Sequence, residues 1–131
     1  MWRRNRRTAR FGALGEVDDS PPPAKIEAIA GIRVPPSAGH IRAQLHQVLT
    51  KQMLYLRFSI EPTELEVVLA DSPFGGRLSV ATFPELLVAS PRPGWFTPES
   101  AKQFTAGQTP GKAILVDTSQ SPLVVYLVAR G

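Results

Sequence analysis

The chain contains no cysteine, and this absence excludes several kinds of site. A disulfide framework, a thiolate nucleophile and a zinc site built on cysteine cannot form. Histidine is scarce as well, because His40 and His46 are the only two. On a strand these two would stand roughly 20 Å apart at ~3.3 Å per residue, too far apart to share one metal ion. We therefore expect no metal site and no cofactor.

Long apolar runs are also missing. No stretch approaches the ~20 apolar residues that a membrane-spanning helix needs, so we expect no transmembrane segment. The apolar piece after the basic N-terminus, residues 11–15, is too short for the core of a secretory signal peptide. The sequence as it stands therefore predicts a cytoplasmic protein. A cell-envelope location is the alternative if a signal peptide is missing from this chain.

Acidic residues are absent from the first ten positions, which hold five arginines: Arg3, Arg4, Arg6, Arg7 and Arg10. Residues 11–131 carry ten Lys/Arg and eleven Asp/Glu, so the net charge of +4 comes from this arm. A mobile arginine arm can bind nucleic acid, an anionic membrane surface or an acidic protein. The alternative is a solvated leader without a function.

Length and composition indicate one domain preceded by an extended lead. A core of ordinary size is expected from 131 residues with 43% hydrophobic side chains. We assign residues 1–23 to a disordered basic arm and proline-rich linker, and residues 24–131 to a single α+β domain. Because like charges repel and the arm has no apolar periodicity, removing residues 1–15 is expected to change stability little.

Hydrophobic periodicity predicts the elements of this domain. Leu54, Leu56, Phe58 and Ile60 alternate with polar neighbours, as in a half-buried strand. Residues 41–49 fit a helical stripe and a strand equally well, and the short polar turn after them favours a hairpin. The segments expected are strands near 41–49, 53–60, 113–117 and 123–129, and helices near 62–70 and 98–104; residues 24–30 could form a further short helix. The predicted fold is an antiparallel sheet of about four strands in ββααββ order, with two short helices on one face.

The first predicted hairpin carries a candidate binding surface. If residues 41–49 form a strand, Arg42, Gln44 and His46 share a sheet face with Tyr55 and Arg57. Such a polar, mildly basic face with an aromatic residue can bind an anion or a single-stranded nucleic acid. The alternative is the ordinary solvated side of an antiparallel sheet.

The second predicted hairpin is apolar on both of its faces. Two short helices and a proline-rich loop are expected to cover only part of it, and an exposed apolar patch usually marks an interface. We therefore predict a protein partner or a homo-oligomer, with Val124, Tyr126 and Val128 at the contact.

No arrangement of residues indicates an enzyme. The segment 107–113, GQTPGKA, departs from a phosphate-binding loop in its spacing, in the alanine after lysine and in the strand that follows. Glu61, Glu64 and Glu66 fall in the first turns of one predicted helix, where carboxylates favour the helix dipole. No serine lies in a G-x-S-x-G motif.

Three phrases resemble small bacterial cell-envelope or lipoprotein-type domains of unknown function: residues 32–38 (IRVPPSA), 54–58 (LYLRF) and 114–119 (ILVDTS). The resemblance covers residues 32–129. It implies a strand at residues 41–49 and a ββα…αββ order, and it assigns no catalytic residue. The chain departs from such proteins in lacking an export signal and a lipid-bearing cysteine.

Taken with the resemblance, these patterns predict a non-enzymatic accessory or interaction module, part of a larger assembly or associated with the cell envelope. The alternative is a protein that binds nucleic acid or an anionic surface through its arginine arm.

Overall fold

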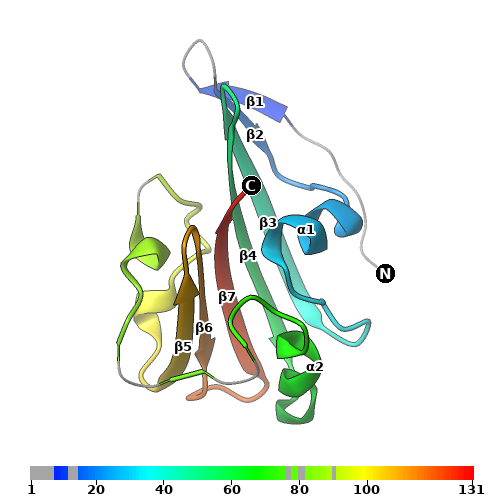
Figure 1. Cartoon of the computed structure of the whole chain (residues 1–131), viewed down its shortest axis with the longest axis vertical. Helices are drawn as coiled ribbons and strands as arrows, with labels where there is room; N and C mark the ends of the chain where they lie inside the picture. Colours follow the sequence, from blue (N-terminus) through cyan, green and yellow to red (C-terminus); the bar gives the residue numbers. More distant parts are fainter. Residues whose placement is uncertain (1–7, 12–14, 76–77, 80–81, 90) are drawn as a thin grey trace.

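Seven antiparallel strands form one sheet in the order β1-β2-β3-β4-β7-β6-β5 (Figure 1). The computed structural model describes residues 8–11, 15–75, 78–79, 82–89 and 91–131. The strands are β1 (Thr8–Phe11), β2 (Gly15–Asp18), β3 (Gly39–Val48), β4 (Lys51–Ile60), β5 (Phe104–Thr109), β6 (Lys112–Asp117) and β7 (Leu123–Arg130). Between them lie the helices α1 (Pro23–Ala30) and α2 (Leu65–Leu69) and the 3-10 turns η1 (Pro62–Glu64), η2 (Glu85–Val88) and η3 (Pro98–Ser100).

The predicted sheet of four strands in ββααββ order is wrong. The four expected strands correspond to β3, β4, β6 and β7, and both expected hairpins are present. Three further strands, β1, β2 and β5, extend this sheet at its two ends. The expected fold therefore missed the strands whose sequences carry little apolar alternation.

The helix expected near residues 98–104 is also wrong. Only the single 3-10 turn η3 forms there, Ala101 is already extended, and β5 begins at Phe104. Thr97 makes no side-chain capping hydrogen bond to this turn. The segment that follows contains Thr105 and Gly107, which are poor helix formers, and it gains a full ladder of hydrogen bonds against β6. The tertiary pairing therefore outweighs the local signal for a helix start, which is the potential capping residue Thr97 followed by Pro98.

The described part of the N-terminal lead belongs to the sheet. Residues 8–11 and 15–18 pair with each other, and β2 then pairs with β3, with Val17 opposite His46. The expectation of a disordered lead over residues 1–23 therefore does not hold for these two strands, and Gly15 is buried. Removing residues 1–15 would delete β1 and the start of β2.

One face of the sheet is covered by α1 and α2. Leu54, Leu56 and Phe58 of β4 point to this side, where they pack with Ile26 of α1 and Val68 of α2 in the larger apolar cluster. The predicted helix near residues 24–30 is present, and Gly31 ends it at a φ of 73°, a left-handed conformation that favours glycine.

The other face is covered by the loop of the same chain that runs from η2 to η3. Leu87 of η2 and Phe96 pack there against Leu115, Tyr126 and other apolar side chains of β4–β7. Both faces of the β6–β7 hairpin are thus buried within one chain. The exposed fractions of Val124, Tyr126 and Val128 are 3%, 2% and 0%, so the predicted partner interface at these residues is corrected: they belong to the core.

Candidate functional site

The register of β3 and β4 brings the predicted basic residues together. Arg42 stands opposite Arg57, Gln44 opposite Tyr55 and His46 opposite Met53. The predicted sharing of one face by Arg42, Gln44, His46, Tyr55 and Arg57 is confirmed, and this is the face that carries the loop. Tyr55 differs from expectation, because it is only 2% exposed and contributes to the core. We call the accessible set of Arg42, Gln44, His46, Arg57 and Trp95 the arginine face.

Trp95 is the residue of this face that the sequence did not indicate. It comes from the loop that crosses β6 and β7, and the Arg42 Cζ atom lies 5.5 Å from the centre of its ring. Trp95 also packs edge-to-face on Phe96, with ring centres 6.2 Å apart. A tryptophan in a proline-rich loop is a visible signal, but no local pattern shows that this loop lies beside β3.

Buried rings support the face from below. Phe96 contacts both Tyr55 and Tyr126 edge-to-face, at 5.2 and 5.5 Å between ring centres, and His46 lies 5.1 Å from Tyr55. Edge-to-face contacts of this kind are favourable beyond the area that they bury. The arginine face therefore rests on a row of packed rings that limits the movement of its side chains.

Arg42 and Arg57 form no ion pair within the described part of the chain, which includes all eleven acidic residues. Directly opposed like charges destabilise a strand pair. Their charges are offset by aromatic rings, since the Arg57 Cζ atom lies 5.8 Å from the centre of Tyr126 and Arg42 lies over Trp95. Two adjacent guanidinium groups, one exposed and one half-buried, thus keep their hydrogen-bond donors available.

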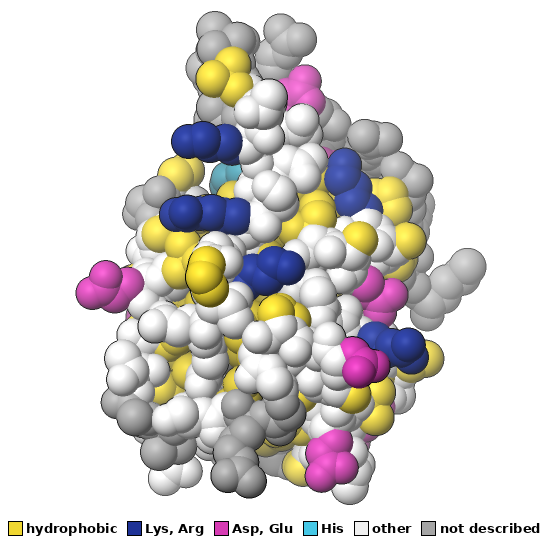
Figure 2. All heavy atoms as spheres, in the orientation of Figure 1, with side chains coloured by type: hydrophobic (Ala, Val, Ile, Leu, Met, Phe, Trp, Pro, Cys, Tyr) yellow, Lys and Arg dark blue, Asp and Glu magenta, His cyan; other side chains and the backbone are white. Residues whose placement is uncertain are grey.

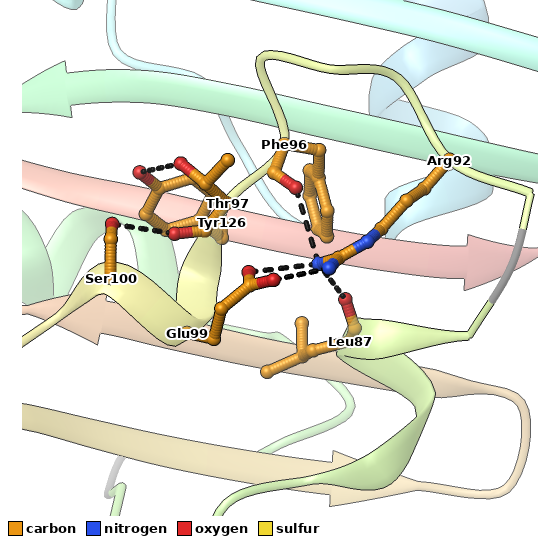
Figure 3. A network of polar contacts seen from close by, with 7 residues as sticks. All are labelled: Leu87, Arg92, Phe96, Thr97, Glu99, Ser100 and Tyr126. Atoms are coloured by element: carbon orange, nitrogen blue, oxygen red, sulfur yellow. Dashed lines mark hydrogen bonds and ion pairs between the residues drawn. The ribbon is translucent and has the colours of Figure 1, made fainter.

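The loop that carries Trp95 is held down by polar contacts (Figure 3). Arg92 donates from both guanidinium nitrogens to the Glu99 carboxylate and from Nη1 to the carbonyls of Leu87 and Phe96, at 3.4 and 3.3 Å. The hydrogen bond from Arg92 lowers the pKa of Glu99. On the sheet side, the Tyr55 hydroxyl donates to the Pro91 carbonyl at 2.7 Å. These contacts connect η2, η3 and β4.

His46 sits at the end of the face nearest β2. One ring nitrogen lies 2.5 Å from Gln44 Oε1, and the Gln44 amide donates to the Asp19 carboxylate at 2.5 Å. Burial lowers the pKa of His46, and the nearby charge of Asp19 opposes that shift. The neutral imidazole is therefore favoured here, and Gln44 connects His46 to the Asp19 carboxylate at the edge of the arginine face.

Other features of the described residues form weaker sites. A cavity of about 270 Å³ lies between α1 and α2, lined by Glu27, Arg33 and Asp71. Glu27 already accepts a hydrogen bond there from the Val34 amide. Basic and acidic side chains are interspersed on the face seen in Figure 2. Among the described residues no group of three acidic or histidine side chains could hold a metal ion.

The arginines of the arm are mostly outside the described residues. Arg3, Arg4, Arg6 and Arg7 fall before Thr8, while Arg10 lies in β1 opposite Glu16 in the strand register. The segment 107–113 forms the end of β5 and the start of β6, joined at Gly111 with a φ of 78°. This turn into a strand agrees with the rejection of a phosphate-binding loop.

Comparison with protein-family models, curated proteins and solved structures found no match for this chain. The resemblance to bacterial cell-envelope domains therefore stays an expectation from sequence. Within the described residues, no helix combines the length and apolar character needed to cross a membrane.

Proposed function

We propose that this protein is a non-enzymatic binding module that holds an anionic ligand on its arginine face. The observation that carries the proposal is the opposition of Arg42 and Arg57 across β3 and β4 without an acidic partner in the described chain. The proposal keeps the non-enzymatic class expected from sequence. It moves the contact surface from the buried β6–β7 hairpin to the accessible side chains of β3 and β4 on the face that carries the loop.

Charge complementarity supports an anion. Guanidinium groups donate several hydrogen bonds in a fixed planar arrangement that matches phosphate and carboxylate oxygens. Two such groups on directly opposed residues lie within reach of one phosphate, because opposed Cβ atoms are about 5 Å apart. An anion between them would relieve the cross-strand repulsion. Binding would thus stabilise a pair that is unfavourable in the free protein.

A direct test measures binding of inorganic polyphosphate, a polymer with charge and no bases. We expect the double variant Arg42→Ala/Arg57→Ala to bind at least about tenfold more weakly than the wild type, with weaker dependence on salt because fewer phosphate contacts are made. Arg33→Ala is the matched control, since Arg33 is exposed in the cavity between α1 and α2. It should bind within about twofold of the wild type.

The arm provides the contrasting variant. Deleting residues 1–7 removes four arginines and leaves β1 in place. We expect this deletion to weaken binding while the remaining affinity still depends on Arg42 and Arg57. Binding that disappears with the arm and is unchanged in the double variant would contradict the proposal and assign the ligand to the arm. Unfolding midpoints of each variant verify that the fold is retained.

A further inference from the structure

Resting on the proposed function, we infer that the anionic ligand is a single-stranded nucleic acid, with a base stacked at Trp95 and its phosphates on Arg42 and Arg57. The inference starts from Trp95, the aromatic side chain that the loop places beside Arg42 on the arginine face. Trp95 is partly exposed, whereas Phe96, Tyr55 and Tyr126 are buried. An accessible ring beside unpaired cations is the combination that single-strand binding surfaces use.

The contacts of Trp95 prepare it for stacking. Its edge-to-face packing on Phe96 and the Arg92 bond to the Phe96 carbonyl restrict the loop on both sides of the ring. Arg42 already lies over this ring, and its side chain is exposed. A base can therefore stack on Trp95 or on the Arg42 plane while the guanidinium edge donates to a phosphate.

The architecture argues against a duplex. Recognition of double-stranded DNA commonly places a helix or a β-ribbon in a groove. Both described α-helices, α1 and α2, pack on the opposite face of the sheet. The arginine face is instead a sheet surface beside a loop, and from Arg42 to His46 it extends about 13 Å at ~3.3 Å per residue. That length fits roughly four stacked bases at ~3.4 Å each.

The arm enters the sheet at the correct edge to contact the same strand of nucleic acid. Thr8 is in register with Asp18, and Asp18 with Leu45, so the chain reaches β1 from the Arg42 end of β3. Two strand spacings, ~10 Å, separate β1 from β3. The seven residues before Thr8 can span at most about 24 Å. Their arginines are therefore attached within reach of phosphates that leave the arginine face.

The experiment uses the full chain with Trp2→Phe, which leaves Trp95 as its single tryptophan. A ~12-nucleotide single-stranded DNA is titrated while Trp95 emission is recorded, with three comparison probes: the matching duplex, inorganic polyphosphate and phosphatidylserine vesicles. We expect the single strand to quench Trp95 and to bind at least about tenfold more tightly than the duplex. Polyphosphate should bind with little quenching, because it has no base to stack.

Substitution of Trp95 separates stacking from charge. Trp95→Leu should weaken binding of the single strand by roughly tenfold or more and leave polyphosphate binding within about twofold, whereas Trp95→Phe should retain most of the affinity. If Trp95→Leu fails to fold, the quenching in the Trp2→Phe protein decides the question.

The outcomes distinguish this inference from the proposed function. Equal binding of all polyanions without quenching would overturn the single-strand assignment and leave the anion proposal standing. A preference for vesicles, with a blue shift of Trp95 in place of quenching, would overturn it in favour of a lipid surface. No binding of any probe would overturn both.

Discussion

At the residue scale, His46 is the titratable group whose environment is most informative. It lies among Tyr55, Gln44 and Val17, half-buried on the arginine face. Burial lowers its pKa, and the charge of Asp19 only partly offsets this. Folding therefore favours the neutral imidazole, and protonation is opposed by the fold itself.

This shift predicts a pH dependence of stability. Since the folded pKa of His46 is below the ordinary value of 6.5, the unfolded chain binds the proton first as the pH falls. The contribution of His46 to stability is therefore complete above pH 6.5, and it is lost as the pH decreases through the pKa of the folded state. We expect urea unfolding at about pH 7.5 and about pH 5.5 to show that the free energy of unfolding decreases less between these two values in His46→Gln than in the wild type.

The exposed His40 supplies the matched control. His40→Gln should preserve the wild-type difference between the two pH values. Asp19→Asn removes the charge that favours the imidazolium, so it should enlarge the loss at acidic pH. An identical pH profile for His46→Gln and the wild type would show that this environment does not affect folding.

At the element scale, the loop from η2 to η3 takes the place of the partner that the sequence predicted for the apolar β6–β7 hairpin. It contains many prolines and no long helix, yet it buries Leu87 and Phe96 fully enough to close one face of the sheet. Arg92 and Glu99 tie its two ends together across seven residues. The loop therefore acts as a covering layer whose position depends on a few polar contacts.

Removing this connection should loosen the loop more than the sheet. We expect Arg92→Ala to lower the free energy of unfolding by about 1 kcal/mol, a small value because both side chains are partly exposed and the ion pair is screened. Arg92→Lys should recover little of it, since an ammonium group cannot form the two-pronged contact. Amide hydrogen exchange should rise in η2 and η3 before it rises in β4 and β7.

Lys102→Ala is the control for charge alone, because Lys102 is exposed near the same loop. It should leave both stability and exchange unchanged. Uniform acceleration of exchange across the sheet in Arg92→Ala would indicate that the ion pair supports the global fold and not the loop in particular.

At the scale of the whole molecule, the sheet has two independent covers: α1 and α2 on one face and the loop on the other. The central strand β7 is consequently buried on both faces from Val124 to Ala129. This explains the consecutive apolar residues of β7, which would be unusual in a sheet with one solvated side. The arginine face occupies the part of the second face that the loop leaves accessible.

A charge on β7 should therefore unfold the protein and not only disrupt an association. Val128→Asp places an unpaired carboxylate at a site with 0% exposure, and we expect a loss of at least about 3 kcal/mol. Val67→Asp on α2, where the side chain is 51% exposed, should change stability by no more than about 0.5 kcal/mol. Thermal unfolding followed by circular dichroism compares the two. A cooperatively folded Val128→Asp protein of wild-type stability would contradict the two-cover arrangement.

The sequence by itself determined the local structure wherever one signal dominated. Period-two alternation located β4, the Gly31 stop ended α1, and the polar turns placed both hairpins. For Arg42 and Arg57 the alternation gave a shared face only on the condition that residues 41–49 form a strand, and the pairing of β3 with β4 fulfils that condition. These are interactions between neighbours in the chain or across a short turn.

Only the tertiary structure decided the remaining features, since they depend on partners far apart in the sequence. Residues 98–104 begin like a helix, but pairing with β6 selects the strand β5. The Tyr55 hydroxyl meets Pro91, 36 residues away, and that loop brings Trp95 over to Arg42. Local propensity differs by less than about 1 kcal/mol per residue for such segments, so burial and ladder hydrogen bonds determine the outcome.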